Sequence, residues 1–501
     1  MELMLDGESL STHDINAIAH DSDLKIKVKI SNKSLEKMKS SRAYVDKIVQ
    51  SDQIVYGINT GFGALSNKNI PREKLKELQY NLIRSHCTGV GEPFFDDTTR
   101  AIMLIRANCL AQGFSGVSLP CVELLLDFIN YGITPIVPKK GSVGASGDLA
   151  PLAHIALCLI GEGEVMYKGE KTSSLTAIQD IKKEPVQLQA KDGLALINGT
   201  AVMCALGSLA IHRSKMLMET ADVISCLTLE AVRGTNSSFS PLITSLKPHP
   251  TQVEVCRHLN EILEDSEILN SHTDCDRVQD PYSLRCIPQV HGACRQTLRH
   301  VEDVLDVENN SVTDNPLIFV EEQRVISGGN FHGEAIALAM DYLSMGAAEM
   351  CSISERRVEK MMNPEFSQLP AFLTDGSGLN SGLMIAQVTS AALASENKIL
   401  AHPASVDSIP TSTDKEDHVS MGVTSGRKLL EIIDNLHYCL AIELLCAYQG
   451  VSFHTPLKSS PRLQKLIEKI SEIIPPIKND RNFSIDINKL YEFIGKGSVL
   501  N

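Results

Sequence analysis

Residues 141–151 read Gly-Ser-Val-Gly-Ala-Ser-Gly-Asp-Leu-Ala-Pro and join a run of small residues to an apolar, helix-like segment at 149–160. Asp148 is of a residue type that commonly caps a helix, and Pro151 is tolerated in a first helical turn. We therefore predict a tight bend followed by a helix that begins after Asp148. The bend brings residues 145–147 to the positive end of the helix dipole.

The tripeptide Ala145-Ser146-Gly147 can form a reactive group from the backbone alone. Gly147 lacks a Cβ, so its amide nitrogen can approach the carbonyl carbon of Ala145 without a clash. Ring closure releases one water, and loss of a second water from Ser146 leaves an exocyclic methylidene on a conjugated imidazolone, with no metal or added cofactor. N–H groups at the helix start would stabilise electron density pushed into this ring. On its own the tripeptide favours an ordinary glycine-rich loop and helix cap, because short motifs recur by chance, and the reactive group depends on what else the chain carries.

The composition indicates a soluble, acidic enzyme. The chain has 501 residues and a formal net charge of −14, and it carries no basic stripe of the kind that binds nucleic acids. Its 13 cysteines are scattered without a Cys-x-x-Cys pair, which favours buried thiols in a reducing compartment over disulfides or zinc. The N-terminus has no signal-peptide pattern, and we find no apolar run long enough to span a bilayer. We expect a cytoplasmic protein without a metal site and with no nucleic-acid or membrane partner.

Helical patterns dominate the chain after a mixed N-terminal part. Residues 24–30 alternate like a half-buried strand. The fold class is predicted to be mainly α, with a smaller mixed globular region over 1–110 and an elongated helical bundle over 111–501. Long apolar helices are expected over 99–131, 198–233, 331–363, 380–402 and 425–450. Helices that are apolar on most faces are buried in a core or by association, so an oligomer is expected.

Several polar side chains stand beside turns, where they can face a cleft. Tyr56 lies in a glycine-rich loop at 55–63, and a phenol can act as an acid or base if the site changes its pKa. Asn198 ends a short apolar run and begins a helix. Arg285, in the segment 279–286, can hold a carboxylate through two hydrogen bonds. Each residue has a structural alternative, respectively a surface tyrosine, a helix cap and an ion pair.

Taken together, the motifs resemble the aromatic amino acid ammonia-lyases, which act on phenylalanine, tyrosine or histidine, and the related aminomutases. The resemblance runs in family order from Tyr56 to past His418 and includes a glycine turn at 327–334 and an acidic loop at 408–418. By itself the acidic loop is typical of a solvated charge run. In this family the Ala-Ser-Gly tripeptide cyclises to a 4-methylideneimidazol-5-one (MIO) group, and loops of more than one subunit of a homotetramer form each active site. The resemblance therefore implies an ammonia-lyase-like fold and little activity as a monomer.

Two places in the sequence bear on the substrate. Ser85-His86 occupies the position that selects the substrate ring, and Glu416 stands where phenylalanine and tyrosine lyases have Gln. A carboxylate and an imidazole suit an imidazole substrate, whereas a buried charge facing a phenyl ring would be unpaired and costly. The resemblance thus implies elimination of ammonia from L-histidine to give trans-urocanate, the first step of histidine degradation.

Lys415 departs from the family pattern, because members that act on histidine commonly have Gln immediately before the glutamate. A nearby ammonium would favour ionised Glu416 and weaken it as a base. We expect Lys415 to point to solvent instead. The departure then bears on the pH optimum more than on the substrate.

The resemblance also implies a role for each site residue. The expected catalytic residues are Tyr56, Ala145, Ser146, Gly147, Tyr282 and Glu416, with Tyr56 chosen for β-proton transfer and Glu416 in support. The expected binding residues are His86 at the imidazole, Arg285 at the carboxylate, Asn198 at the carboxylate or the prosthetic ring, Gln279 at the prosthetic group and substrate, and Phe331 at the pocket wall. Two alternatives stay open: a tyrosine or phenylalanine lyase or aminomutase, and a non-catalytic helical scaffold.

Overall fold

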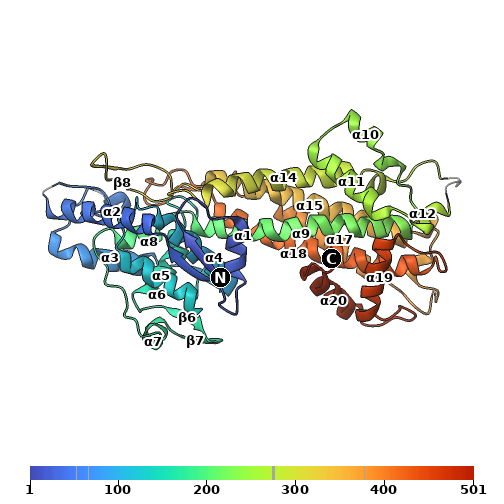
Figure 1. Ribbon diagram of the computed structural model, residues 1–501, viewed down its shortest axis with the longest axis horizontal. Coiled ribbons are helices and arrows are strands. Elements are labelled where there is room, and N and C mark those ends of the chain that lie inside the picture. Colours follow the sequence, from blue (N-terminus) through green and yellow to red (C-terminus); the bar gives the residue numbers. More distant parts are fainter. Residues whose placement is uncertain (52, 66, 273–276, 377, 501) are drawn as a thin grey trace. The chain divides into compact units, whose positions relative to one another are not determined.

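The computed structural model describes residues 1–51, 53–65, 67–272, 277–376 and 378–500 (Figure 1). The chain divides into two compact units, the first comprising Met1–His212, Val301–Asp341 and Pro403–Arg427, and the second Arg213–His300, Tyr342–His402 and Lys428–Asn501. The chain crosses from one unit to the other once after α17 (Met384–Leu400), at His402–Pro403, and otherwise within four long helices: α9 (Ala201–Ala231), α14 (Ile287–Glu308), α15 (Glu334–Met362) and α18 (Gly422–Ser452). The predominance of helix agrees with the predicted class. The division near residue 110 is not tested by this clustering and stays a prediction.

The first unit combines shorter helices with small sheets. Its remaining helices are α1 (Thr12–Ala19), α2 (Asn32–Gln50), α3 (Leu75–His86), α4 (Asp96–Ala111), α5 (Leu119–Tyr131), α6 (Leu149–Leu159), α7 (Ser174–Asp180) and α8 (Asp192–Ile197). Strand β1 (Glu2–Leu5) pairs in parallel with β2 (Lys27–Ile30), and three antiparallel sheets contain β3 (Val90–Pro93) with β5 (Pro138–Lys140), β4 (Thr134–Pro135) with β6 (Glu164–Tyr167) and β7 (Glu170–Ser173), and β8 (Leu317–Phe319) with β9 (Arg324–Ile326).

The single helix expected over 99–131 is wrong, because the chain forms α4 and α5 with a connection between them. Gly113 and Gly116 in this connection have φ values of 80° and 65°, which do not fit a right-handed helix. A Cβ at Gly116 would lie 2.4 Å from side-chain atoms of Val45 and Ile318. The turn therefore lets the chain pass close to neighbouring elements that the local apolar pattern does not reveal.

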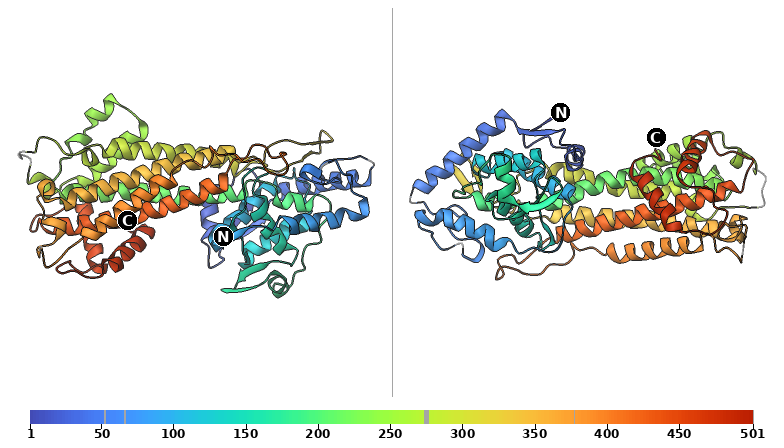
Figure 2. Two further views of the ribbon diagram at one scale, coloured as in Figure 1. Left: turned by 180° about the vertical axis from the view of Figure 1, so that it is seen from behind. Right: turned by 90° about the horizontal axis from the view of Figure 1, so that it is seen from below.

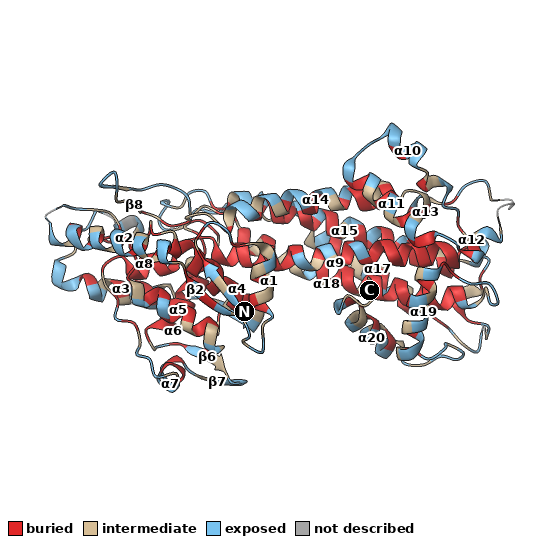
Figure 3. Cartoon of the chain, viewed as in Figure 1, coloured by how far each residue is buried: buried red, intermediate tan, exposed pale blue. Residues whose placement is uncertain are grey.

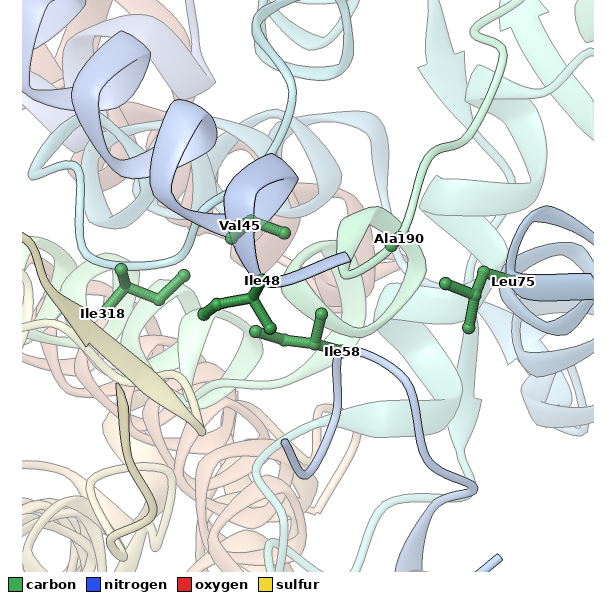
Figure 4. Close-up of a cluster of buried hydrophobic side chains, with 6 residues drawn as sticks. All are labelled: Val45, Ile48, Ile58, Leu75, Ala190 and Ile318. Atoms are coloured by element: carbon green, nitrogen blue, oxygen red, sulfur yellow. The ribbon is translucent and has the colours of Figure 1, made fainter. Parts of the chain in front are cut away.

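An apolar cluster holds the loop that carries Tyr56. It contains Val45, Ile48, Ile58, Leu75, Ala190 and Ile318, all of them buried (Figure 4). Ile58 lies two residues beyond Tyr56 and is completely buried, so burial of its side chain fixes this part of the loop beside α2. Burial of one such side chain is worth about 1.5–3 kcal/mol, which offsets the conformational entropy of ordering about one or two backbone residues.

The second unit is a helical bundle. Its other helices are α10 (Pro241–Leu246), α11 (Pro250–Leu263), α12 (Glu267–Asn270), α13 (Tyr282–Arg285), α16 (Pro364–Ser367), α17 (Met384–Leu400), α19 (Pro461–Ile473) and α20 (Phe483–Gly495). Within this unit α9, α14, α15 and α18 run side by side (Figure 2) and are joined by buried polar side chains. His291 lies 2.7 Å from Asp222 and 3.3 Å from Arg357, which donates to Glu443 at 2.9 Å. These contacts satisfy groups that would be costly to bury alone.

Burial differs between the long and the short helices (Figure 3). Residues of α9 are buried on nearly every face, whereas α2 keeps an exposed side. Helix α15 is long and apolar enough to cross a membrane by length and composition, but 67% of its most apolar window is buried within the protein. This degree of burial is typical of a core helix.

Candidate functional site

Glycine is required at position 147 by both conformation and space. Gly147 has a φ of 70°, and a Cβ there would lie 2.2 Å from the carbonyl oxygen of Gly199. The two glycines form a bridge, and the N–H of Asp148 donates to the Gly199 oxygen at 2.8 Å. The Ala-Ser-Gly turn is therefore in backbone contact with the segment that begins α9.

Asp148 is the N-cap residue of α6 and the helix begins at Leu149, as predicted, but the Asp148 side chain makes no hydrogen bond to the N–H groups of α6. Its Oδ2 instead accepts hydrogen bonds from the N–H groups of Val202 and Met203, at 2.8 and 3.0 Å. The reason is the approach of Gly147 to Gly199, which places the unpaired N–H groups at the start of α9 within reach of this carboxylate. Burial raises the pKa of Asp148 to about 7, although the backbone hydrogen bonds oppose the rise. The turn thus joins the N-termini of α6 and α9.

Glu416 accepts hydrogen bonds from three hydroxyl groups, one of them in the turn. Ser146 Oγ donates to Oε1 at 2.6 Å, while Thr411 and Ser412 donate to Oε2 at 2.6 and 2.9 Å. Burial acts to raise the pKa of Glu416, but these hydrogen bonds and the nearby His86 outweigh it, so the pKa lies below its ordinary value. Lys415 is exposed, as expected. The acidic loop is therefore a solvated charge run only in part.

The charge of Glu416 acts on two more of the expected site residues. Burial lowers the pKa of His86, at the end of α3, and Glu416 partly opposes this shift. Burial also raises the pKa of Tyr56, and the charges of Glu416 and Asp314 add to the rise. At neutral pH the site therefore holds a neutral imidazole, a protonated phenol and an ionised carboxylate.

Asn198 is oriented by acceptors on its nitrogen side. Nδ2 donates to Asp314 Oδ1 at 3.1 Å and to the carbonyl oxygen of Asn315 at 3.0 Å. Oδ1 is buried and has no hydrogen-bond partner in the part of the chain that the structure describes. Such an unpaired buried acceptor costs free energy unless a ligand supplies a donor.

Phe331 lies just before α15 in a loop held by backbone and side-chain contacts. The side chain of Asn330 donates to the carbonyl oxygen of Val312 at 3.2 Å, and the His332 ring stacks on His418 with centroids 5.8 Å apart. Phe331 is partly exposed. These contacts tie the glycine turn to the segment that follows Glu416.

The remaining expected residues, Gln279, Tyr282 and Arg285, belong to the second unit. Gln279 is exposed, and the Tyr282 side chain is 71% exposed. The Arg285 guanidinium lies 4.6 Å from the Tyr282 ring centroid, and its Nε is buried without a hydrogen-bond partner among the described residues. No ion pair of Arg285 occurs within the described ranges, so the structural alternative for this arginine gains no support.

Sequence reasoning missed Lys191 and Asp314. Both side chains are fully buried and form an ion pair at 2.7 Å, and Asp314 also contacts Asn198. The only sequence signal is the Asp314-Asn315-Pro316 turn pattern before β8, which predicts a loop and not a buried charge.

No group of three or more His, Cys, Asp or Glu side chains suited to a metal ion occurs among the residues that were described. The described cysteines are free thiols, and most of them are buried.

A model of the family described as aromatic amino acid lyase matches residues 10–472. Histidine ammonia-lyase of Myxococcus xanthus (strain DK1622) is 47% identical over 498 residues, covering 99% of this chain and 97% of that protein. The crystal structure of histidine ammonia-lyase from Trypanosoma cruzi matches with a TM-score of 0.92 and 41% identity, covering 100% of this chain and 94% of that one. Tyrosine aminomutase from Streptomyces globisporus matches with a TM-score of 0.94 and 35% identity, covering 100% and 98%. The predicted ammonia-lyase-like fold is confirmed.

Proposed function

This chain belongs to the aromatic amino acid lyase family, and from this premise we propose that it is a histidine ammonia-lyase, a carbon–nitrogen lyase that converts L-histidine into trans-urocanate and ammonia. The choice of L-histidine as the substrate rests on the carboxylate of Glu416. This carboxylate accepts a hydrogen bond from Ser146 in the Ala-Ser-Gly turn and raises the pKa of His86 against the effect of burial. An ionised carboxylate and an imidazole match the N–H and nitrogen lone pair of an imidazole substrate, whereas a phenyl ring would leave both unpaired.

The residues of the turn fit the MIO group that the family implies. Gly147 lies where any Cβ would overlap the Gly199 oxygen, so the backbone can approach closely there. Helix α6 begins at Leu149, two residues after Gly147, so the N–H groups of its first turn lie close to the place where the ring would form. When formed from Ala145-Ser146-Gly147, MIO supplies the electrophile that makes the substrate amino group a good leaving group. We propose that it forms autocatalytically and that no external cofactor is needed.

Tyr56 and Glu416 are assigned to movement of the β-proton. In the free site Glu416 is ionised, because its pKa is lowered. Tyr56 is protonated, because its pKa is raised. Tyr56 therefore needs a proton acceptor before it can act as the base, and the neighbouring carboxylate offers one. His86 and Glu416 hold the imidazole, and Phe331 shapes the pocket.

Gln279, Tyr282 and Arg285 are proposed to act in a site completed by another subunit. The Tyr282 ring is exposed, and Arg285 Nε has no hydrogen-bond partner among the residues that the structure describes, so both groups are available to another subunit. Arg285 clamps the substrate carboxylate through two hydrogen bonds. Exposed apolar side chains on one face of α17, namely Ile385, Val388 and Ile399, support association into the homotetramer. We place the enzyme in the cytoplasm, where its free thiols suit reducing conditions.

Ultraviolet absorbance of the purified protein, mixed separately with L-histidine, L-tyrosine and L-phenylalanine, tests the proposal. We expect growth of urocanate absorbance with L-histidine only, and its loss in Ser146→Ala. Intact mass spectrometry tests the prosthetic group. We expect the parent protein to be lighter than its sequence mass by two waters, and a folded Ser146→Ala variant to have its full sequence mass. Formation of coumarate or cinnamate would instead identify a tyrosine or phenylalanine ammonia-lyase. Formation of rearranged β-amino acids would identify an aminomutase. No product from any of the three amino acids, together with an intact mass that shows no loss of two waters, would identify a non-catalytic scaffold.

A further inference from the structure

A fully buried ion pair lies next to the site. Lys191 Nζ is 2.7 Å from Asp314 Oδ2, both side chains have 0% exposure, and Lys191 adopts a φ of 75°, which is unfavourable for a lysine. A buried ion pair contributes little to stability compared with apolar residues of the same size, because both charges lose their hydration. A role in orienting neighbouring groups would explain its presence better.

The second oxygen of Asp314 determines how Asn198 is turned. Oδ1 accepts from Asn198 Nδ2 at 3.1 Å and from the N–H of Asn315 at 2.7 Å. The other Nδ2 hydrogen goes to the Asn315 carbonyl oxygen at 3.0 Å. Both partners are acceptors only, so they must meet the NH2 group and not the oxygen of the carboxamide. Within the described ranges of the chain, the buried acceptor Oδ1 is therefore the one group of the Asn198 carboxamide that has no partner.

The segment around Asp314 also contacts two other parts of the site. The side chain of Asn315 accepts from the N–H of Gly328 at 2.9 Å, in the turn that precedes Phe331. Pro316 packs so closely on the loop of Tyr56 that a Cβ on Gly57 would lie 2.8 Å from its Cδ. Asp314 is thus fixed to three segments of the site, and Lys191 holds its carboxylate in place.

We propose that Lys191 and Asp314 are positioning residues, which present the carboxamide oxygen of Asn198 to the α-amino group of the substrate. The inference rests on the proposed function, because it takes L-histidine as the ligand. A free acceptor needs a donor, and a carboxylate would be repelled. L-histidine has two donors, the imidazole N–H and the α-ammonium group, and the imidazole is held by His86 and Glu416. The protonated phenol of Tyr56 is assigned to movement of the β-proton. The α-amino group is the donor that remains, so Asn198 binds it and not the carboxylate.

Calorimetric titration of the tetramer carrying Ser146→Ala measures binding without turnover. Two ligands are compared: L-histidine, and imidazole-4-propanoate, which differs only by lacking the α-amino group. In Asp314→Asn we expect the oxygen of the new carboxamide to face the ammonium group of Lys191. Its NH2 group then faces the NH2 group of Asn198, two donors meet, and the Asn198 side chain loses the hydrogen bond that orients it. We expect the Kd of L-histidine to rise about tenfold, as for a hydrogen bond to a charged group, and that of imidazole-4-propanoate to change less than twofold. Asn198→Ala should give the same pattern.

Lys191→Met combined with Asp314→Asn is the second variant, because it removes both charges and lets the oxygen of residue 314 accept from Asn198 again. Recovery of L-histidine affinity to within about threefold of the parent is expected, since the hydrogen bond is restored in neutral form. Asp192→Asn is the control: this buried carboxylate pairs with Arg42 and the Ser118 N–H and has no hydrogen bond to Asn198.

Equal weakening of both ligands in Asp314→Asn would overturn the proposal, because Asn198 would then face the carboxylate or the pair would only support the fold. Unchanged affinity for both ligands would overturn it as well. Failure of the parent enzyme to form urocanate from L-histidine concerns the proposed function instead, and it is measured separately in the protein with intact Ser146.

Discussion

The hydroxyl oxygen of Ser146 lies 2.6 Å from Oε1 of Glu416, although 270 residues separate them along the chain. The hydrogen bond joins the Ala-Ser-Gly turn to the acidic loop and is the largest of the influences that lower the pKa of Glu416. Dehydration of Ser146 would remove this donor. The carboxylate would then be more basic in the mature site than beside the intact serine.

Replacement of Glu416 by glutamine is expected to lower kcat for L-histidine by about two to four orders of magnitude, the range for loss of a proton-transfer group. Steady-state urocanate formation measures the effect, and intact mass shows whether both waters are still lost. Lys415→Gln is the matched control and should change kcat less than twofold, because Lys415 is exposed. A loss below tenfold in Glu416→Gln would remove this residue from proton transfer.

Gly147→Ala is expected to prevent the turn from forming its contact with Gly199 and to abolish the loss of two waters. The strained φ and the clash together should lower the free energy of unfolding by about 1–3 kcal/mol or more. Gly169→Ala is the control, because Gly169 also has a positive φ, 81°, but a Cβ there meets nothing within 4 Å. Urea unfolding and mass spectrometry compare the two. Equal effects in both variants would contradict a special need for space at position 147.

Asp148 should make the protein less stable as the pH rises. Burial raises its folded-state pKa to about 7 from an ordinary value of 3.8. The folded protein thus binds this proton more tightly than the unfolded chain, so its contribution to stability is complete below about pH 4 and is lost as the pH rises through about 7. Asp148→Asn should flatten the decline in Tm between pH 5 and pH 8.

Asp6→Asn provides the comparison for this pH effect. Burial acts to raise the pKa of Asp6, but hydrogen bonds from the N–H groups of Glu8 and Ser9 and the hydroxyl of Ser9 outweigh it, so the pKa lies below its ordinary value of 3.8. Its contribution is present above about pH 4 and is lost only as the pH falls below that value, so this variant should keep the slope of Tm between pH 5 and pH 8. An identical slope in the parent and in Asp148→Asn would show that another group titrates.

Two charges on the exposed face of α17 should break the assembly. Val388 and Ile399 are 51% and 75% exposed, and Val388→Lys with Ile399→Lys places ammonium groups where apolar contact is proposed. We expect a smaller mass in light scattering and at least a tenfold loss of activity at low protein concentration, because the site would lack Arg285 of another subunit. Glu472→Lys, an exposed change on α19, is the control. A tetramer that survives both lysines would place the interface elsewhere.

Residue type and spacing alone indicated the Ala145-Ser146-Gly147 turn as a candidate reactive group. Tyr56 and Glu416 could be named only through the family resemblance, because by their local patterns they suit a surface tyrosine and a solvated charge run. Their roles in the site stay predictions. The helix over 198–233 was also predictable, since its apolar pattern is long and unbroken. The break after Ala111 was not, because its glycines meet distant segments: Gly113 lies against Lys37, and Gly116 lies against Val45 and Ile318.

Polar contacts between residues far apart in the chain could not be predicted from the sequence. Lys191 lies in a polar stretch where lysines are normally solvated, and its partner Asp314 is 123 residues away. Asp148 looked like the cap of its own helix, yet it binds N–H groups of another helix that begins far along the chain. Nothing local distinguishes the two outcomes, because the same carboxylate satisfies either helix end.

The contact of Asp148 with α9 bears on when the reactive turn can arise during protein synthesis. A ribosome that has released only the first 160 residues has made the tripeptide and the helix after it, but neither Gly199 nor the N–H groups of Val202 and Met203. Until they dock, the turn has no Gly199 backbone to close against, and the Asp148 carboxylate lacks its two backbone donors from α9 and keeps only the hydroxyl of Ser142, at 3.2 Å. Cyclisation would thus be a late step of biogenesis, and fragments that end before α9 would remain chemically inert.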